Sequence, residues 1–170
     1  LNFYRLDLFA KGYGYPFAVD NMDYSKDGIW EVDVRTNTNK LILTLETIIN
    51  FNPKNYKNMQ HYINHVAYTV DEKSIIFIHR WQIKGGEFKS RLLIYNLNNK
   101  TLDTLLDNDH VSHYCWKDKQ TLFIYATNAD LQKGYMEVDI LNKKTKVIEG
   151  LPLEDGHPSY SNNKNIILTD

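Results

Sequence analysis

The stretch that decides the fold is His65-Val-Ala-Tyr-Thr-Val-Asp-Glu-Lys-Ser-Ile-Ile-Phe-Ile, because two later stretches can be laid over it. They are His113-Tyr-Cys-Trp-Lys-Asp-Lys-Gln-Thr-Leu-Phe-Ile-Tyr-Ala and His157-Pro-Ser-Tyr-Ser-Asn-Asn-Lys-Asn-Ile-Ile-Leu-Thr-Asp. The three histidines are 48 and 44 residues apart, and a repeat of that period is typical of propeller blades. In each stretch a short polar turn separates two apolar runs, which predicts a hairpin of two strands, called A and B below.

A second hairpin, of strands C and D, also recurs. Its first run is Ile29-Trp-Glu-Val-Asp-Val, Leu92-Leu-Ile-Tyr-Asn-Leu or Tyr135-Met-Glu-Val-Asp-Ile, and each leads through a polar turn into another apolar run. The sequence therefore predicts an all-β fold, a β-propeller of four-stranded antiparallel blades with about three blades present. The predicted divisions are a C–D hairpin with a loop in 1–60, one blade in 61–109, one in 110–154 and an A–B hairpin in 155–170.

About three blades do not make a closed ring, since propellers typically have 4 to 8. One interpretation is that further blades belong to a longer chain, because this one starts at Leu1 rather than Met and stops at Asp170 directly after an apolar run. The other is a homodimer, in which strands A and B of one copy pair with C and D of the other and give about six blades. Both interpretations stay open at this point.

The composition excludes several classes of protein. Net charge is −1, with 20 basic and 21 acidic residues well mixed, so nucleic-acid binding is not expected. No apolar run approaches the ~18 residues of a membrane span, so no membrane association is expected either. A single cysteine, Cys115, allows no internal disulfide and leaves the compartment, cytoplasmic or periplasmic, undecided.

The three repeated histidines are the first candidate site. Strand A lines the central channel of a propeller, so His65, His113 and His157, each expected to begin strand A, would ring its mouth. Three converging imidazoles suit a divalent transition ion such as manganese, zinc or iron. The alternative is structural: each histidine would bond the backbone of a neighbouring blade.

The second candidate is His79-Arg80-Trp81, which ends strand B of the first full blade and breaks the repeat, since Ala126 and Asp170 are expected at the position of His79. Arginine can bind a carboxylate with two hydrogen bonds, and histidine can act as a base near neutral pH. The alternative is that Arg80 pairs with an acidic loop residue while Trp81 packs on it.

Further residues and two loops are expected near these candidate sites. His61 and His110 precede two of the repeated histidines and are interpreted as secondary or incidental. Asp155 could orient His157 or bind a metal itself, and Gly156 could allow a close backbone approach. Residues 44–61 and 81–90 are expected to be long loops on the face that carries the site.

Several segments resemble an uncharacterised bacterial propeller family that is similar to the oligogalacturonate lyases. They are Asn64-His65, the run from Phe77 to Trp81, Val111-Ser-His113-Tyr-Cys-Trp116, Asp155-Gly-His157-Pro-Ser-Tyr-Ser and Leu168-Thr-Asp170. The resemblance covers most of 61–170. It implies a seven-bladed propeller in which several histidines and a glutamine hold manganese and a further histidine and arginine serve the chemistry.

Carried over to this chain, the resemblance implies that His65, His113 and His157 hold the metal and that His79 and Arg80 are the catalytic pair. The close-spaced glutamine and histidines of the lyases are not found in this sequence. The expected function is a metal-dependent lyase that acts on an acidic oligosaccharide by β-elimination. The rivals are a non-catalytic module that binds a glycan or protein, and a purely structural set of blades.

Overall fold

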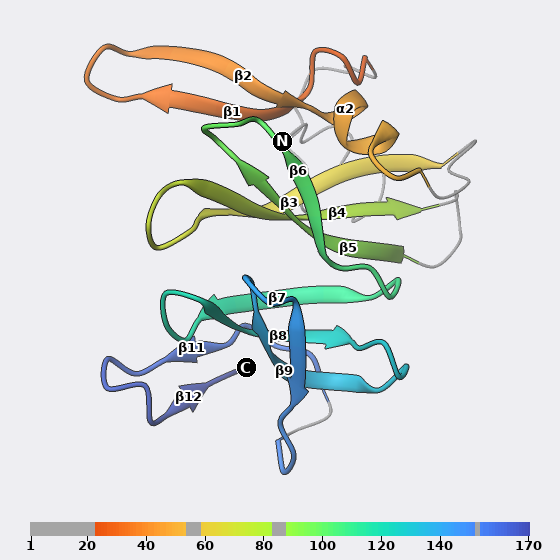
Figure 1. The fold of residues 1–170 in the computed structure, drawn as a ribbon, viewed down its shortest axis with the longest axis vertical. Helices are drawn as coiled ribbons and strands as arrows, with labels where there is room; N and C mark the ends of the chain where they lie inside the picture. Colours follow the sequence, from red (N-terminus) through yellow and green to blue (C-terminus); the bar gives the residue numbers. More distant parts are fainter. Residues whose placement is uncertain (1–22, 54–58, 83–87, 152–153) are drawn as a thin grey trace. The chain divides into compact units, whose positions relative to one another are not determined.

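Strands dominate the computed structural model of this chain, which describes residues 23–53, 59–82, 88–151 and 154–170 (Figure 1). Its elements in chain order are β1 (Gly28–Asp33), β2 (Thr38–Thr44), α2 (Leu45–Asn50), β3 (Gln60–Tyr68), β4 (Ser74–Gln82), β5 (Phe88–Asn96), β6 (Leu102–Leu106), β7 (Val111–Trp116), β8 (Thr121–Thr127), β9 (Lys133–Asp139), β10 (Lys144–Val147), β11 (Ser159–Tyr160) and β12 (Ile167–Leu168).

The strands form two sheets of four, β3-β4-β5-β6 and β7-β8-β9-β10, and two hairpins, β1-β2 and β11-β12. Every predicted A, B, C and D run is a strand, so the all-β prediction is confirmed. No closed barrel or propeller is detected among the described residues, and the blade interpretation is therefore taken up below as a proposal.

The described residues divide into two compact units. The first unit contains those up to Val66 and those of His79–Phe88, and the second contains Ala67–Ile78 and Lys89–Asp170. The boundary between the two units passes through β3 and β4 rather than between strands. The boundaries predicted from the sequence, at residues 60, 109 and 154, stay a prediction. Each unit is described by itself.

The three C–D turns share one structure. The last residue of strand C is Asp or Asn, and its side-chain oxygen accepts a hydrogen bond of 2.9 to 3.0 Å from the backbone N–H two residues later. These residues are Asp33, Asn96 and Asp139. Four residues on, the backbone is left-handed in each turn, at Asn37, Lys100 and Lys143. The repeat found in the sequence is thus also a repeat of local geometry.

The A–B turns are less regular. The backbone N–H of Thr69 donates to the carbonyl of Ser74, and that of Ser161 to Ile166, whereas Lys117 closes a turn one residue shorter by donating to Thr121. Counted from these bonds, Ser74, Thr121 and Ile166 are equivalent. The prediction that Asp170 is equivalent to His79 is therefore wrong by one residue, and Asp170 corresponds to Ile78.

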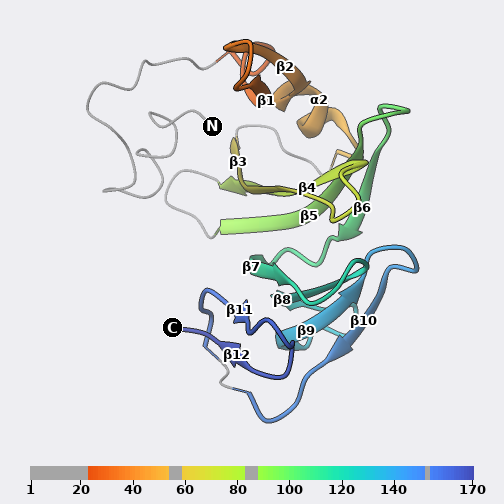
Figure 2. The ribbon, with the colours of Figure 1, turned by 90° about the vertical axis from the view of Figure 1, so that its left-hand side faces the viewer.

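Both faces of the sheet β7–β10 are buried within the second unit, as alternate residues of β8 show. Leu122 and Ile124 pack with Met136 and Val138 against side chains of β4, β5 and β6, including Ile76, Leu92, Leu105 and Leu106. On the other face Phe123 and Tyr125 pack with Tyr135, and Tyr160 and Ile167 of the β11-β12 hairpin cover them (Figure 2). Burial on both faces explains why these strands read as continuous apolar runs.

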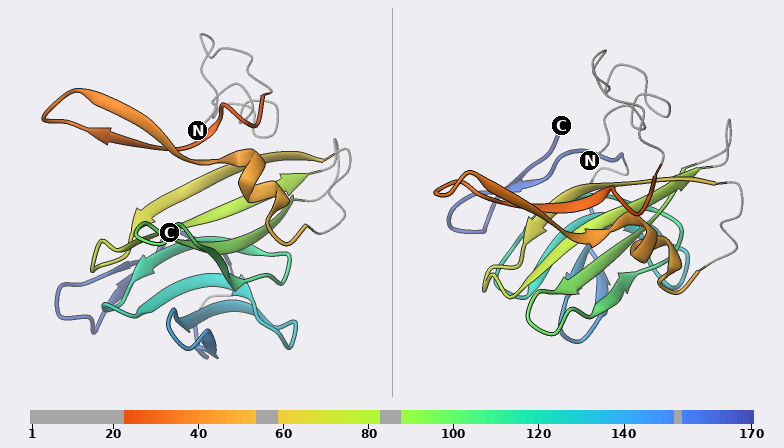
Figure 3. Two further views of the ribbon diagram at one scale, coloured as in Figure 1. Left: turned by 45° about the horizontal axis from the view of Figure 1, so that its top comes forward. Right: turned by 90° about the horizontal axis from the view of Figure 1, so that it is seen from above.

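The segment 44–61, predicted as a loop, contains the helix α2, which follows β2 directly (Figure 3). Thr44 is its N-cap, since the hydroxyl oxygen accepts a 3.0 Å hydrogen bond from the backbone N–H of Thr47. Leu45 and Ile48 are its buried residues. A helix of six residues has too few turns for a clear helical periodicity, which is why the sequence pattern missed it. In the segment 81–90, also predicted as a loop, Trp81 and Gln82 belong to β4 and the residues from Phe88 on belong to β5, while 83–87 lie outside the described residues.

The repeated histidines do not all begin a strand, which corrects that prediction. His65 lies inside β3, His113 is the third residue of β7, and His157 precedes β11 by two residues. Backbone irregularity accounts for the difference, because φ is +50° at His65 and the pairing register of β7 with β8 shifts between Val111 and Tyr114.

Candidate functional site

Two of the three predicted metal histidines lie against each other. The ring centroids of His113 and His157 are 3.8 Å apart, with an angle of 41° between the ring planes. His113 comes from the irregular part of β7, and His157 from the segment that enters β11. The repeat alignment therefore identified two side chains that meet in space within the second unit.

Each ring of this pair faces its own carboxylate through Nδ1. Asp155 Oδ1 lies 3.2 Å from His113 Nδ1, and Asp170 Oδ1 lies 3.2 Å from His157 Nδ1. A carboxylate at Nδ1 favours the tautomer with hydrogen on Nδ1 and turns Nε2 toward any ligand. Asp155 thus orients His113, which corrects the expectation that it would orient His157.

Further hydrogen bonds hold the two carboxylates. The hydroxyl of Ser112 donates to Asp155 Oδ2 and lies 3.1 Å from His113 Nδ1. The backbone N–H of His157 donates to Asp170 Oδ1 at 2.6 Å, and this bond, with the His157 side chain, lowers the pKa of Asp170. Ser112 and Asp170 therefore position the pair, although the sequence analysis assigned no role to Ser112.

Gly156, between Asp155 and His157, permits this arrangement. A Cβ atom at this position would collide with the backbone oxygen of Asp170 and the hydroxyl of Thr169. The expected close approach is thus confirmed, and it brings the residues after β12 next to His157.

The His113–His157 pair is open to solvent. The exposed fraction of the side chain is 23% for His113 and 66% for His157. In the described parts of the chain, no group of three or more His, Cys, Asp or Glu residues is arranged to hold a metal ion. His65 belongs to the first unit, and its role as third ligand stays a prediction.

The predicted catalytic pair lies in the first unit, and His79 is buried there. Its Nε2 lies 3.0 Å from Nδ1 of His61, the two rings stack at 5.2 Å, and the indole of Trp81 lies 5.3 Å from the His79 ring. His61, interpreted as incidental, is thus a direct partner of His79. A role of His79 as a base would require substrate to reach a ring with no exposed surface, and it stays a prediction.

Arg80 is half-buried, and its Nε donates to Asn64 Oδ1 at 3.1 Å. The partner of Arg80 is thus the carboxamide of Asn64, whereas the sequence suggested an acidic loop residue as its partner. Nearby, burial raises the pKa of Tyr62, an effect that the charge of Arg80 opposes.

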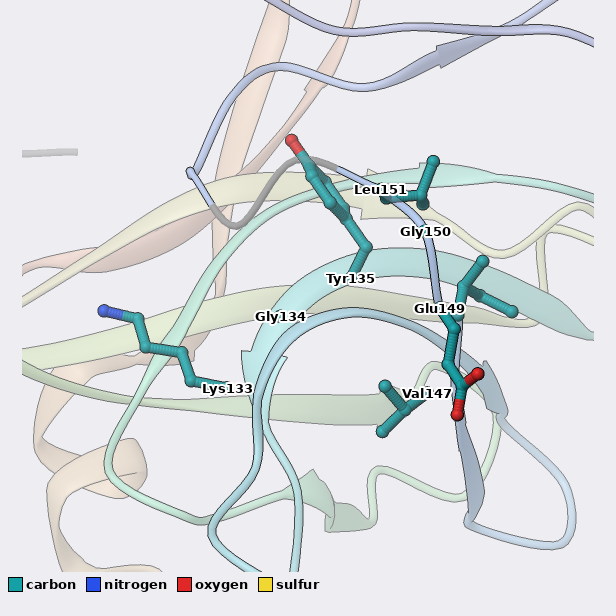
Figure 4. Close-up of a pocket in the computed structure, with 8 residues that line it drawn as sticks. Lys133, Gly134, Tyr135, Val147, Glu149, Gly150 and Leu151 are labelled. Atoms are coloured by element: carbon teal, nitrogen blue, oxygen red, sulfur yellow. The ribbon is translucent and has the colours of Figure 1, made fainter.

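The second unit also contains a pocket of about 250 Å³ next to β9 (Figure 4). Its walls include Lys133, Tyr135, Val147, Ile148, Glu149 and Leu151, which come from the start of β9 and from the chain at and after the end of β10. Figure 4 shows Lys133 and Glu149 on opposite sides of the pocket. No sequence pattern marks this pocket, because its residues occupy ordinary strand and turn positions.

Comparison with protein families, with characterised proteins and with solved structures found no match to this chain. The resemblance to oligogalacturonate lyases therefore rests on the quoted residues alone. Among the described residues, no helix is long and apolar enough to cross a membrane.

Proposed function

We propose that the chain contributes blades to a β-propeller and that this propeller is a metal-dependent lyase-like protein acting on acidic oligosaccharides. The blade assignment is supported by the two sheets of four strands in chain order and by the equal C–D turns. The functional assignment depends on one observation above all, the paired imidazoles of His113 and His157 with a carboxylate at each Nδ1.

The residues present fit part of a metal centre. His113 and His157 would hold a divalent ion, manganese by the resemblance, through Nε2, while Asp155 and Asp170 keep the rings oriented. When bound, such an ion acts as a Lewis acid toward the carboxylate of a uronate and stabilises negative charge that develops beside it. His65 is the proposed third ligand, by its place in the repeat.

The remaining chemistry falls to residues of the first unit. Arg80 would bind an acidic group of the sugar, because a guanidinium presents several donors in a planar array. The hydrogen bond from Arg80 Nε to Asn64 Oδ1 fixes the direction of the arginine side chain. β-Elimination also needs a base next to the uronate carboxylate, and His79 is the candidate from sequence.

Metal content measured on the purified chain tests this proposal. After dialysis against manganese, wild type should retain the ion, and His113→Ala and His157→Ala should each lose most of it. His110→Ala is the matched control, since His110 lies close in sequence but does not belong to the pair. Equal manganese content in wild type and all three variants, with unchanged circular dichroism, would refute the metal assignment.

The burial of His79 favours a second candidate function, a non-catalytic module that binds an acidic glycan. In that case the chain would bind metal and oligogalacturonate without forming an unsaturated product. Ultraviolet absorbance of the product separates the two functions, because only elimination creates a new conjugated double bond.

A further inference from the structure

The pocket beside β9 lies where strands β9 and β10 separate. Their pairing ends with Val147 opposite Met136, and the backbone N–H of Ile148 adds one bond to the carbonyl of Tyr135. Strand β9 begins two residues before Tyr135, at Lys133, whereas residues 148–151 belong to no strand. The pocket is therefore a gap beside the first residues of β9.

The β1-β2 hairpin shows what fills the same place when the two strands stay together. Gly28 and Gly134 hold equivalent positions, each five residues before the end of its strand C, and their φ angles are 152° and 156°. A Cβ atom at Gly28 would lie 2.0 Å from the backbone oxygen of Leu43 in β2, whereas a Cβ atom at Gly134 would meet no atom of the described residues within 4 Å. The space that β2 fills beside Gly28 is thus open beside Gly134.

Most of the pocket wall is apolar. Its apolar residues, which are all half-buried or buried, are Tyr135, Val147, Ile148 and Leu151. Tyr135 is held in place, because its ring stacks on Phe123 at 5.0 Å and its hydroxyl shares a 2.7 Å hydrogen bond with that of Thr169. Such a wall suits an aliphatic chain, whose burial removes apolar surface from water.

Two charges of opposite sign complete the wall. Lys133 and Glu149 are exposed and lie on opposite sides of the pocket (Figure 4). Neither forms an ion pair with another described residue, and the Lys133 ammonium lies 5.8 Å from the centroid of the Tyr125 ring. A positive and a negative group with apolar surface between them match a ligand that carries a carboxylate at one end and an ammonium at the other.

We propose that this pocket binds a small linear zwitterion with the chemistry of an ω-amino acid. Its carboxylate accepts from Lys133, its ammonium donates to Glu149, and its methylene chain lies against Val147, Ile148 and Leu151. The size agrees, because about 250 Å³ is less than the roughly 300–1,000 Å³ that drug-sized ligands occupy. The inference needs neither the metal nor the lyase activity of the proposed function.

A series of ligands tests the proposal on the wild-type chain in the presence of a chelator. The methyl NMR signals of Val147, Ile148 and Leu151 should shift with ε-aminocaproate, with a Kd of about 1–10 mM. Caproate and hexylamine each lack one charge and should bind about two- to fivefold more weakly. Each methylene removed, as in γ-aminobutyrate, should weaken binding by about fourfold. Unmoved methyl signals up to the solubility limit of ε-aminocaproate, or equal binding of ε-aminocaproate, caproate and hexylamine, would overturn the proposal.

Two charge variants test which end of the ligand each residue binds. Lys133→Met should weaken ε-aminocaproate and caproate by about two- to fivefold and leave hexylamine unchanged, while Glu149→Gln should weaken ε-aminocaproate and hexylamine and leave caproate unchanged. Lys146→Met is the matched control, because Lys146 is an exposed residue of β10 that does not line the pocket. Circular dichroism checks that the variants fold. Equal affinities for ε-aminocaproate in Lys133→Met and Lys146→Met, or a loss of hexylamine binding in Lys133→Met, would contradict the assignment.

Discussion

The imidazole rings of His113 and His157 pack against each other at 3.8 Å, and each keeps a carboxylate at its Nδ1 atom. Histidine binds a metal through a ring nitrogen, and because Nδ1 of each ring lies next to a carboxylate, Nε2 is the candidate donor in both. The irregular backbone at β7 and the entry to β11 turn both rings to the same place.

Replacing Asp170 by Asn should weaken metal binding without unfolding the chain. Asn keeps an acceptor for the His157 backbone N–H but removes the charge that orients the ring, and losses of this kind are typically about 10–100-fold in affinity. Titration calorimetry with manganese measures the change. Asp139→Asn is the matched control, because Asn96 fills the same turn position naturally. Equal affinities for the two variants would show that Asp170 does not position His157.

The carboxyl of Asp170 should titrate at a pH below its ordinary value of 3.8, because the His157 N–H favours its charged form. With a folded pKa below the unfolded one, its interaction is fully present above the unfolded value and is lost as pH falls through the folded value. Carbon-13 NMR of the Asp170 side chain gives the midpoint directly. A midpoint at or above 3.8 would mean that the bond from His157 is not made in solution.

Met136→Ala should destabilise the second unit by about 2–5 kcal/mol, because the methionine is fully buried in the core shared by β4–β6 and β7–β9. Leu141→Ala, at an exposed turn position, should change the free energy of unfolding by about 0.5 kcal/mol or less. Urea denaturation of both variants measures the difference. A small effect of Met136→Ala would show that the two sheets are not packed together in solution.

The His61–His79 contact should show up as coupling between two substitutions. Each single change to Ala removes one partner of a buried hydrogen bond and should cost about 1–3 kcal/mol. A double-mutant cycle should then give a coupling energy of about 0.5–3 kcal/mol. Additive effects of His61→Ala and His79→Ala would mean that the two rings do not interact.

The strands could be predicted because apolar runs and polar turns alternate, and the prediction succeeded even for the short hairpin β11-β12. The turn closed by Lys117 is one residue shorter than those closed by Thr69 and Ser161, and no composition signal marks this. Strand register is set by such turn bonds. The shorter turn aligns Ala126 with His79 as predicted, whereas the equal turns closed by Thr69 and Ser161 align Asp170 with Ile78, so the predicted equivalence of Asp170 with His79 was wrong by one residue although both strands were found.

The site was partly predictable for a related reason. His113 and His157 could be found because they hold equal places in the sequence repeat. The partners of the two rings could not be predicted from the sequence. Asp155 contacts His113 across 42 residues, and Ser112 holds Asp155 only through a side-chain hydrogen bond. The burial of His79 was also invisible, because it depends on His61 and Trp81 packing around it.

An anomalous-scattering map of crystals grown with manganese tests the central claim most directly. The account predicts a single strong peak at bonding distance, about 2 Å, from Nε2 of both His113 and His157. A map without a peak at this pair, or with the metal bound only elsewhere in the chain, would contradict it.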